Sequence, residues 1–376
     1  MRIAQIIPAL PKGGAERLVL NLCRQLSIRG HDVLVISFTH ENKYFDLSSG
    51  CNIKVIRSKI HYSILGASVI QTAEYNRIID DFKPDIIHSH LIDAELVSRN
   101  RTSNSIRYVT HWHGCPELIN PIPINKIFSK DTMWKWNTKR ILKKQYRDCR
   151  NHFLCISGFI KGYVQKNLGI NENDISVLHN AIDLGLFRPI PIKKKAGFRL
   201  INIGSLQSNK NHMFLLALMR KLINAGYDDL YLDIYGEGPE LNRLLEEKTK
   251  LGLDEKVVFH GIVDNIEEQL NQAHVLVHSA WHEPFGLILV EAMACGIPVI
   301  SFNTGGPAEL IKEGFTGYLT EKDDLETFAD RVTMLYGDME KLDPLGANGQ
   351  KFAQSFGLEA YTQQVESLYE KLLSAN

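Results

Sequence analysis

The sequence predicts an α/β protein of two doubly wound units, each built around a parallel sheet. Residues 3–37 read as strand, helix and strand, because a short apolar run is followed by leucines at helical spacing and then by a second apolar run. The same order returns over residues 198–235, after a stretch with Pro, Lys and Gly (188–197) that is typical of a linker. A chain of 376 residues also has the length of two ordinary domains.

The other elements are expected where apolar runs end in glycine or polar residues. Strands are predicted at 53–56, 84–90, 108–114, 153–157, 175–178, 257–259, 275–278 and 297–302. Ser157 is expected to cap a helix at 158–167. Beyond Gly317 the chain reads as helical through Tyr336, and an amphipathic helix is expected at 359–373.

The composition is typical of a soluble globular protein without a spanning helix. Hydrophobic residues make up 44% and charged residues 23% of the chain, and no apolar run approaches about 18 residues. The first residues read as a strand and not as a signal peptide. The six cysteines have no C-x-x-C spacing, which argues against zinc and against disulfides and favours a reducing cytoplasm.

Basic residues gather in the first half of the chain. Residues 1–190 carry 26 Lys and Arg against 16 Asp and Glu, a balance of +10, whereas residues 191–376 carry 17 against 27, a balance of −10. An anionic partner of the first half is one interpretation, and attraction between the halves is the other. The segment 126–150 holds nine Lys and Arg with interleaved aromatics, as expected for a helix on an anionic membrane. Nucleic acid and a solvated helix face remain alternatives.

Two carboxylates in the second half stand eight residues apart. Glu283 and Glu291 flank Pro284, which is tolerated in a first helical turn, so a helix is expected to begin there with both carboxylates on one face. Gly296 is expected to end this helix in a left-handed cap. An ordinary helix with surface glutamates is the alternative interpretation, because such pairs also occur by chance.

Glycine turns and one lysine indicate phosphate-binding positions. Gly13 and Gly14 precede a predicted helix, whose N-terminal N–H groups can hold a phosphate. Lys210 stands just before the helix predicted at 212–226 and adds a positive charge to its N-terminus. The turn at Gly236 is a weaker signal of the same kind.

Histidines follow two predicted strands of the first half. His111 and His113 flank Trp112, and strand alternation places them on one face. Such a pair can bind metal, but the sequence shows no evident third ligand, so no metal is expected. His90 ends the strand predicted at 84–90 and is interpreted as a structural residue, with an acceptor contact as the alternative.

Several stretches resemble retaining glycosyltransferases of family 4, which have the GT-B fold. The run WHEPFGLILVEAMACGIPVISFNTGGPAELI resembles the family's E-x7-E region, and PDIIHSH, YVTHWHG, GEGP and HNAID resemble four further segments. The GGAE-R segment is similar to the family's first loop. The segment GSLQSNK resembles its phosphate loop, with Ser205 where the family has Arg and with the Lys retained. Ala181 likewise replaces a usual Gly.

The resemblance implies two Rossmann-like domains that face a central cleft. The expected domains are 1–190 on the acceptor side and 191–357 for the nucleotide-sugar, with the helix at 358–376 crossing back onto the first domain. The catalytic residues it implies are His113, Glu283 and Lys210. The donor-binding residues it implies are Gly13, Gly14, Gly204, Ser205, Lys210, Gly236, Val263, Glu283, Pro284, Phe285, Gly286, Leu287 and Glu291. His90 and Glu16 are expected on the acceptor side, and Lys139, Arg140, Lys143 and Lys144 at the membrane surface.

The function that the resemblance implies is transfer of a hexose-type sugar with retention of configuration. The donor is a UDP- or GDP-sugar, and the acceptor a glycan or a polyprenyl- or lipid-linked molecule of cell-surface polysaccharide or glycolipid synthesis. No cofactor, metal or nucleic acid is expected, since no D-x-D pattern stands in a plausible donor loop. The expected location is cytoplasmic, with peripheral attachment to the membrane's inner face. A sugar-nucleotide epimerase of the same fold and a non-catalytic nucleotide- or lipid-binding protein are the alternatives.

Overall fold

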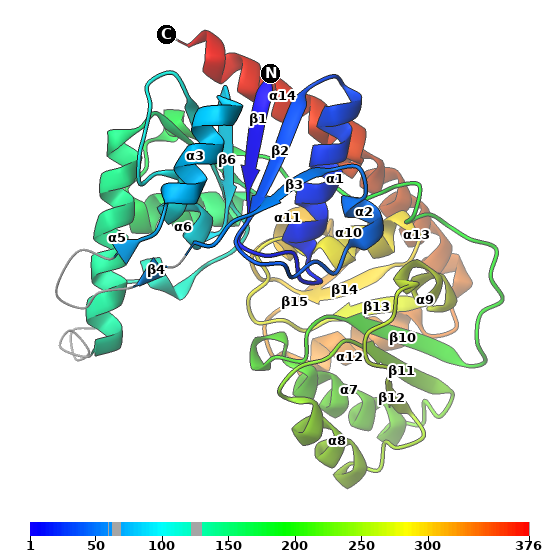
Figure 1. Cartoon of the computed structure of the whole chain (residues 1–376). Coiled ribbons are helices and arrows are strands. Elements are labelled where there is room, and N and C mark those ends of the chain that lie inside the picture. Colours follow the sequence, from blue (N-terminus) through cyan, green and yellow to red (C-terminus); the bar gives the residue numbers. More distant parts are fainter. Residues whose placement is uncertain (59, 62–68, 122–129, 376) are drawn as a thin grey trace. The chain divides into compact units, whose positions relative to one another are not determined.

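The computed structural model describes residues 1–58, 60, 61, 69–121 and 130–375, and these form two compact units (Figure 1). The first unit comprises Met1–Asn180 with Leu358–Asn376, and the second unit comprises Ala181–Gly357. In the sequence, the boundary between the two units therefore lies between residues 180 and 181, ten residues before the expected boundary at 190. The sequence 188–197 belongs to the second unit.

A parallel sheet of seven strands forms the centre of the first unit. Its strand order is β3-β2-β1-β6-β7-β8-β9. The strands are β1 (Arg2–Ile6), β2 (Asp32–Ser37), β3 (Asn52–Val55), β6 (Ile86–His90), β7 (Arg107–Trp112), β8 (Asn151–Cys155) and β9 (Ile175–Val177). The order reverses between β1 and β6. At such a switch point the loops after the strands diverge and leave room for a ligand at the carboxyl edge.

The helices of the first unit cover both faces of this sheet. They are α1 (Gly14–Ile28), α2 (Phe45–Ser48), α3 (Ala73–Phe82), α4 (Ile92–Ser98), α5 (Lys130–Asp148), α6 (Gly158–Leu168) and α14 (Leu358–Ser374). Ala4 and Ile87 pack with α3 and α4, so strand alternation turns Gln5 and His88 to the opposite face. Ser157 accepts a hydrogen bond from Ile160 N and caps α6, as predicted. A short antiparallel pair, β4 (Ile60–His61) and β5 (Val69–Ile70), stands apart from the sheet.

The C-terminal helix α14 packs on the first unit, as predicted. Glu366 forms ion pairs with Arg29 at 2.6 Å and with His31 at 2.7 Å. The Tyr369 hydroxyl lies 3.1 Å from Gln5 Nε2 and 2.6 Å from His88 Nδ1. These contacts join residues more than 280 positions apart, so the last helix completes the face that carries Gln5 and His88.

A parallel sheet of six strands forms the centre of the second unit, with the same reversal of order. The order is β12-β11-β10-β13-β14-β15, and the switch point lies between β10 and β13. The strands are β10 (Phe198–Ile203), β11 (Leu230–Tyr235), β12 (Val257–Phe259), β13 (Val275–His278), β14 (Val299–Phe302) and β15 (Gly317–Thr320). Both units therefore have the Rossmann-like architecture that the sequence predicts.

Helices cover both faces of the second sheet as well. They are α7 (His212–Asn224), α8 (Leu241–Lys250), α9 (Ile266–Gln272), α10 (Leu287–Ala294), α11 (Pro307–Leu310), α12 (Leu325–Leu335) and α13 (Met339–Ala353). Helix α7 packs against α12 and α10 against α13, and Figure 1 shows the two pairs on opposite sides of the sheet.

The expectation of a continuous helix beyond Gly317 is wrong for its first residues. Gly317–Thr320 form β15, and α12 begins only at Leu325. A Cβ on Gly317 would lie 2.3 Å from the carbonyl oxygen of Val299, so glycine permits the close pairing of β15 with β14.

Candidate functional site

Lys210 and Glu283 form an ion pair at the switch point of the second unit. Lys210 lies in the loop that follows β10, and Glu283 lies in the loop that follows β13. Lys210 Nζ is 2.5 Å from Glu283 Oε2. Both side chains are largely shielded, with 25% and 13% of their surface exposed. The pair therefore spans the crevice where doubly wound sheets bind their ligands.

Hydrogen bonds between the same two loops hold Lys210 in place. Ser279 Oγ donates to the backbone oxygens of Lys210 and Asn211, each at 3.0 Å. Trp281 N donates to Asn209 O at 2.9 Å. Asn211 has a left-handed backbone (φ 54°), which turns the chain from Lys210 into α7. Lys210 is thus fixed at the N-terminus of α7, where the helix dipole adds to its charge.

Glu283 is held as a carboxylate. Burial favours its neutral form, but a hydrogen bond from His278 and the charge of Lys210 outweigh burial and lower the pKa of Glu283 to about 2. His278 Nε2 lies 3.2 Å from Glu283 Oε2, and its Nδ1 lies 3.2 Å from Ser301 Oγ. At neutral pH Glu283 therefore acts only as a hydrogen-bond acceptor.

The prediction that Glu283 and Glu291 share one helix face is wrong. Helix α10 begins at Leu287, so Glu283 lies in the preceding loop, whereas the buried Glu291 lies within the helix. Gly286 ends the loop with a left-handed backbone (φ 98°), and this turn separates the two carboxylates. The predicted end of the helix is confirmed, because Gly296 follows α10 with φ 74°.

The loop around Glu283 packs tightly against the glycine turn after β14. Gly306 N donates to Glu283 O at 2.8 Å. A Cβ on Gly306 would lie 2.3 Å from the Phe285 backbone, so the turn requires glycine there. Phe285 itself is 2% exposed and anchors the loop in the core. Pro284 and Leu287 are half-buried beside it.

The other predicted donor-binding residues of the second unit also follow strand ends. Gly204 and Ser205 follow β10, Gly236 follows β11 and Val263 follows β12. Gly236 has φ 139°, and a Cβ there would lie 2.0 Å from Gly204 O, so these two turns lie in direct contact. Ser205 is exposed and Val263 half-buried. They share the carboxyl edge of the sheet with Lys210.

In the first unit, the predicted glycine loop precedes α1. The Tyr44 hydroxyl accepts a hydrogen bond from Gly13 N at 2.9 Å and donates to Gly13 O at 2.8 Å. Gly14 begins α1. Glu16, in the first turn, is 9% exposed, and burial raises the pKa of its carboxyl group. Tyr44 thus holds the loop that presents the N-terminus of α1.

His90 and His113 contact each other at the switch point of the first unit. His90 Nδ1 lies 2.9 Å from His113 Nε2, and His90 Nε2 lies 2.8 Å from Gln5 Oε1. Burial lowers the pKa of His113 to about 4. Burial, with the neighbouring His88 and His113, lowers the pKa of His90 well below its usual value. Both rings are neutral near pH 7.

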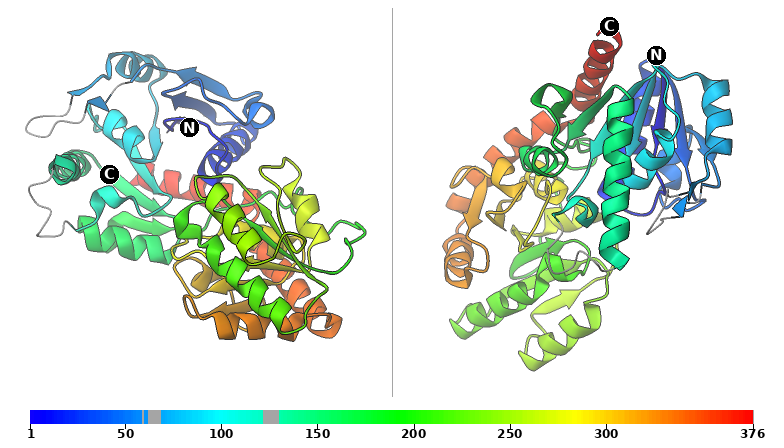
Figure 2. Two further views of the ribbon diagram at one scale, coloured as in Figure 1. Left: turned by 90° about the horizontal axis from the view of Figure 1, so that it is seen from below. Right: turned by 90° about the vertical axis from the view of Figure 1, so that its left-hand side faces the viewer.

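The basic residues predicted for a membrane surface lie on α5, the long helix beside the first sheet in the right-hand view of Figure 2. Arg140 lies over the ring of Trp136 at 5.5 Å, and Trp136 is 58% exposed. Lys139 donates to Ile119 O, and Lys144 pairs with Asp148. Residues 126–129 of the basic segment lie outside the described residues. Within the described part of the chain, no helix has the length and apolarity needed to span a membrane.

Sequence reasoning missed three residues that support these loops. His278 bonds Glu283, Tyr44 bonds Gly13, and Asp323 accepts hydrogen bonds from Asn211 at 3.0 Å and from Trp281 Nε1 at 2.8 Å. For His278 a signal existed, because a polar side chain at the carboxyl end of a buried strand faces the ligand edge. Tyr44 and Asp323 carry no comparable sequence signal.

Comparisons with known proteins match both halves of the chain. Residues 12–186 match the model described as Glycosyltransferase Family 4, and residues 186–352 match Glycosyl transferases group 1. The N-acetyl-alpha-D-glucosaminyl L-malate synthase of Bacillus anthracis is 31% identical over 54% of this chain. That match spans 55% of the relative's own length. The phosphatidylinositol N-acetylglucosaminyltransferase gpi3 subunit of Schizosaccharomyces pombe is 24% identical over 97% of this chain and 79% of its own.

A solved structure shares the architecture along the whole chain. Anabaena HepE, crystallised in complex with UDP, has a TM-score of 0.80 at 19% identity and covers 99% of this chain and 100% of its own. Two parallel doubly wound sheets and this likeness thus define the GT-B fold. The two family matches narrow this class further: the chain belongs to glycosyltransferase family 4.

Proposed function

We propose that the protein transfers a hexose-type sugar from a UDP- or GDP-sugar to a glycan or lipid-linked acceptor, with retention of configuration. The observation that carries this proposal is the Lys210–Glu283 pair at the second switch point. A cation beside a helix N-terminus suits a diphosphate, and an ionised carboxylate beside it suits the hydroxyl groups of a sugar. A nucleotide-sugar contains both groups in adjacent positions.

Lys210 is assigned to the diphosphate. When the bond between the anomeric carbon and the phosphate oxygen breaks, negative charge develops on the departing nucleoside diphosphate. Lys210 and the N–H groups at the start of α7 are positioned to stabilise that charge. Gly204 and Ser205 lie at the same edge, where the Gly204 N–H donates to Tyr235 O and holds the turn in place. Ser205 supplies a hydroxyl where the family resemblance calls for an arginine fork, so Lys210 carries more of this role.

Glu283 is assigned to the hydroxyl groups of the donor sugar. Its carboxylate accepts hydrogen bonds and is oriented by His278 and Lys210. Pro284, Phe285, Gly286 and Leu287 form the wall of the sugar subsite. Glu291 is assigned to the ribose, and Gly236 and Val263 to the nucleotide and its base.

In the first unit, His113 is assigned to the sugar or the acceptor. Because burial keeps its ring neutral, it contributes a hydrogen bond and not a positive charge. His90 and Glu16 are assigned to the acceptor side. The Gly13–Gly14 turn is assigned to the donor phosphates, through the N–H groups at the start of α1.

The comparisons support the donor class. The names of both relatives contain an N-acetylglucosaminyl group, one of them as a transferase, and the Anabaena structure contains UDP. Phosphatidylinositol in the name of the yeast relative supports a lipid-linked acceptor. We accordingly place the reaction in cell-surface polysaccharide or glycolipid synthesis. The sugar transfer itself is proposed to need no metal cofactor, since Lys210 and α7 supply the positive charge.

A peripheral membrane location on the cytoplasmic side is part of this proposal. The exposed Trp136 with Arg140 suits the headgroup region of an anionic membrane. A cavity of about 670 Å³ lies nearby, at the amino ends of β7 and β8. Its cationic lining residues are Arg107, Lys143, Arg147, Arg150 and Lys371. The six cysteines are all free thiols, which supports a reducing compartment.

Incubation with candidate UDP- and GDP-sugars tests the reaction class. With a suitable glycan or lipid-linked acceptor, the protein should release the nucleoside diphosphate and form a glycoside. Conversion of the donor to another sugar nucleotide without acceptor would indicate an epimerase instead. Binding of nucleotides with no diphosphate release under any donor and acceptor would contradict the proposed transfer.

A further inference from the structure

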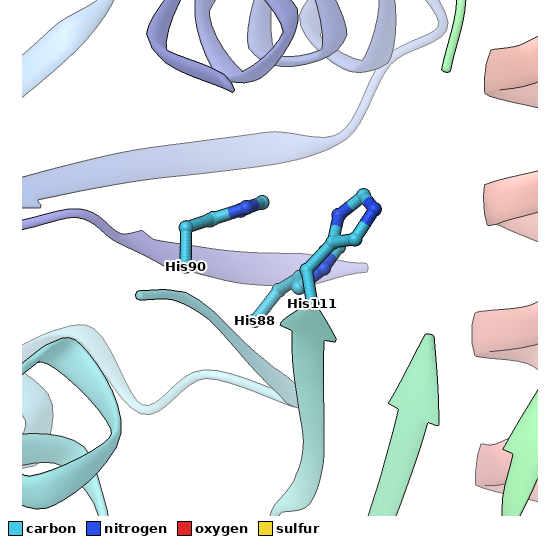
Figure 3. Close-up of side chains that lie close together, drawn as sticks. All are labelled: His88, His90 and His111. Atoms are coloured by element: carbon cyan, nitrogen blue, oxygen red, sulfur yellow. The ribbon is translucent and has the colours of Figure 1, made fainter. Parts of the chain in front are cut away.

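Three histidines from two neighbouring strands meet inside the first unit (Figure 3). His88 and His90 lie on β6 two residues apart, so they share one face of the sheet. His111 lies on β7 directly opposite His90. One ring nitrogen from each of the three lies within 4.8 Å of the others, and all three residues are at most 1% exposed.

The polar atoms of this cluster are incompletely bonded. Among the described residues, His88 Nε2 and both ring nitrogens of His111 have no hydrogen-bond partner, although they are buried. Buried polar atoms in folded proteins are nearly always paired. These three nitrogens belong to two neighbouring rings and require an explanation. A ligand shared by His88 Nε2 and one nitrogen of His111 would pair two of them.

In His88 and His90, one ring nitrogen is bonded to a neighbouring oxygen, as is the nitrogen that faces away from the ion in a metal-ligating histidine. His90 Nε2 donates to Gln5 Oε1, which leaves the lone pair on Nδ1. His88 Nδ1 contacts the Tyr369 hydroxyl at 2.6 Å, and a hydroxyl can accept as well as donate. The Gln5 carbonyl oxygen behind His90 and the Tyr369 hydroxyl behind His88 orient two of the three rings, as is usual behind metal-ligating histidines. His111 has no such partner among the described residues.

We propose that His88, His90 and His111 bind one transition-metal ion of the Zn²⁺ class. Three imidazole nitrogens form a known ligand set for Zn²⁺, which also suits Co²⁺, Ni²⁺ and Cu²⁺. Zn–N bonds of about 2.0–2.1 Å place tetrahedral ligands about 3.3 Å apart, so the rings close inward from their present separation when the ion binds. For the first unit, this proposal departs from the sequence-based expectation that the protein binds no metal.

The site goes beyond the proposed transfer and connects to it through one contact. His90 Nδ1 now accepts from His113 Nε2 at 2.9 Å. When His90 uses Nδ1 as a ligand, His113 loses this acceptor, and its ring is free to turn. The metal would thus adjust the position of a residue assigned to the sugar or the acceptor.

Metal retention by the full-length, untagged protein tests the site. The protein is stripped with a chelator, incubated with ZnCl₂, desalted and analysed for bound zinc. We expect about one zinc per wild-type chain, and a rise in apparent melting temperature as the zinc concentration increases. His111→Gln and His88→Asn should each reduce the retained zinc at least about tenfold. His40→Ala changes an exposed histidine of the same unit and should leave it unchanged.

Cobalt provides a readout that does not depend on the folding of any variant. Co²⁺ added to the stripped wild-type protein should give the intense visible absorption of a tetrahedral nitrogen-ligated ion, and Zn²⁺ should abolish it. Retention of less than about a tenth of a metal ion per wild-type chain would overturn the proposal. Equal retention by folded His111→Gln and wild-type protein would also overturn it, because the ion would then be bound elsewhere.

Discussion

Lys210 Nζ and Glu283 Oε2 lie 2.5 Å apart and join the two loops that diverge at the switch point of the second sheet. The pair brings together residues 73 positions apart. It also brings one positive and one negative side chain to the place where a nucleotide-sugar is proposed to present its diphosphate and its sugar. Lys210 and His278 keep Glu283 ionised before any donor binds.

Lys210→Met should lower kcat/KM for donor turnover at least about 100-fold, because the departing diphosphate loses its main cation. Steady-state kinetics of diphosphate release measures this effect. Lys221→Met removes a lysine of α7, the helix that follows Lys210, and the partner of Lys221, Glu326, is exposed. That control should keep nearly full activity. Equal activity of the two variants would contradict the assignment of Lys210 to the donor site.

The pH dependence of stability should report the ionisation of Glu283. The folded protein lowers its pKa from 4.5 to about 2, so its contribution to the free energy of unfolding is fully present above about pH 4.5. The contribution is lost as the pH falls through that window. Denaturant unfolding of wild type and Glu283→Gln should therefore give a stability difference that shrinks between pH 4.5 and 2. A difference that stays constant across this window would contradict the assigned carboxylate.

Ionisation of the His113 ring should not contribute to the pH profile of kcat/KM near neutrality. Its folded pKa of about 4 keeps the ring neutral from pH 6 to 8. His113→Gln retains a hydrogen-bonding group, so it should lower turnover without changing the shape of the kcat/KM profile in that range. Loss of an inflection near pH 6.5 in this variant would show that the wild-type ring titrates there.

Charge on α5 should govern binding to anionic vesicles. Replacing Lys139, Arg140, Lys143 and Lys144 with Gln should weaken binding to vesicles of anionic lipid, since each cation near such a surface contributes about 1 kcal/mol. Vesicle co-sedimentation at low and moderate salt measures the fraction of protein bound to the vesicles. The matched control replaces four cations of the second unit, Arg243, Lys248, Lys250 and Lys256, with Gln. Equal loss in both variants would contradict a surface centred on α5.

Local sequence signals predicted the regular elements well. Apolar runs located most of the sheet strands, Ser157 marked the start of α6, and Gly296 marked the end of α10. These features depend on neighbours within a few residues, which the sequence displays directly. The start of α10 was predicted too early because Pro284 fits a helical turn. The glycine turn at Gly286 is required by the close packing of the loop against Gly306, which is a long-range contact.

Which residues make up each site was only partly predictable from the sequence, because the sites also depend on long-range contacts. Lys210 and Glu283 were singled out separately, but their ion pair depends on the pairing of β10 with β13. The other two histidines of the proposed metal site, His88 and His90, come from β6, and only the register of β6 with β7 places them beside His111. Tyr369 reaches His88 because the last helix returns to the first unit. Contacts across hundreds of residues leave no spacing pattern in the sequence.

The turnover of Glu283→Gln tests the central claim most directly. Glutamine keeps the size of the side chain but removes the charge that Lys210 and His278 stabilise, so kcat should fall at least about 100-fold while the protein remains folded. Glu326→Gln serves as the control, because Glu326 is an exposed partner of Lys221. Diphosphate release by both variants and wild type is measured with a productive donor and acceptor. Near-wild-type turnover of Glu283→Gln would contradict the assignment of this site to the donor sugar.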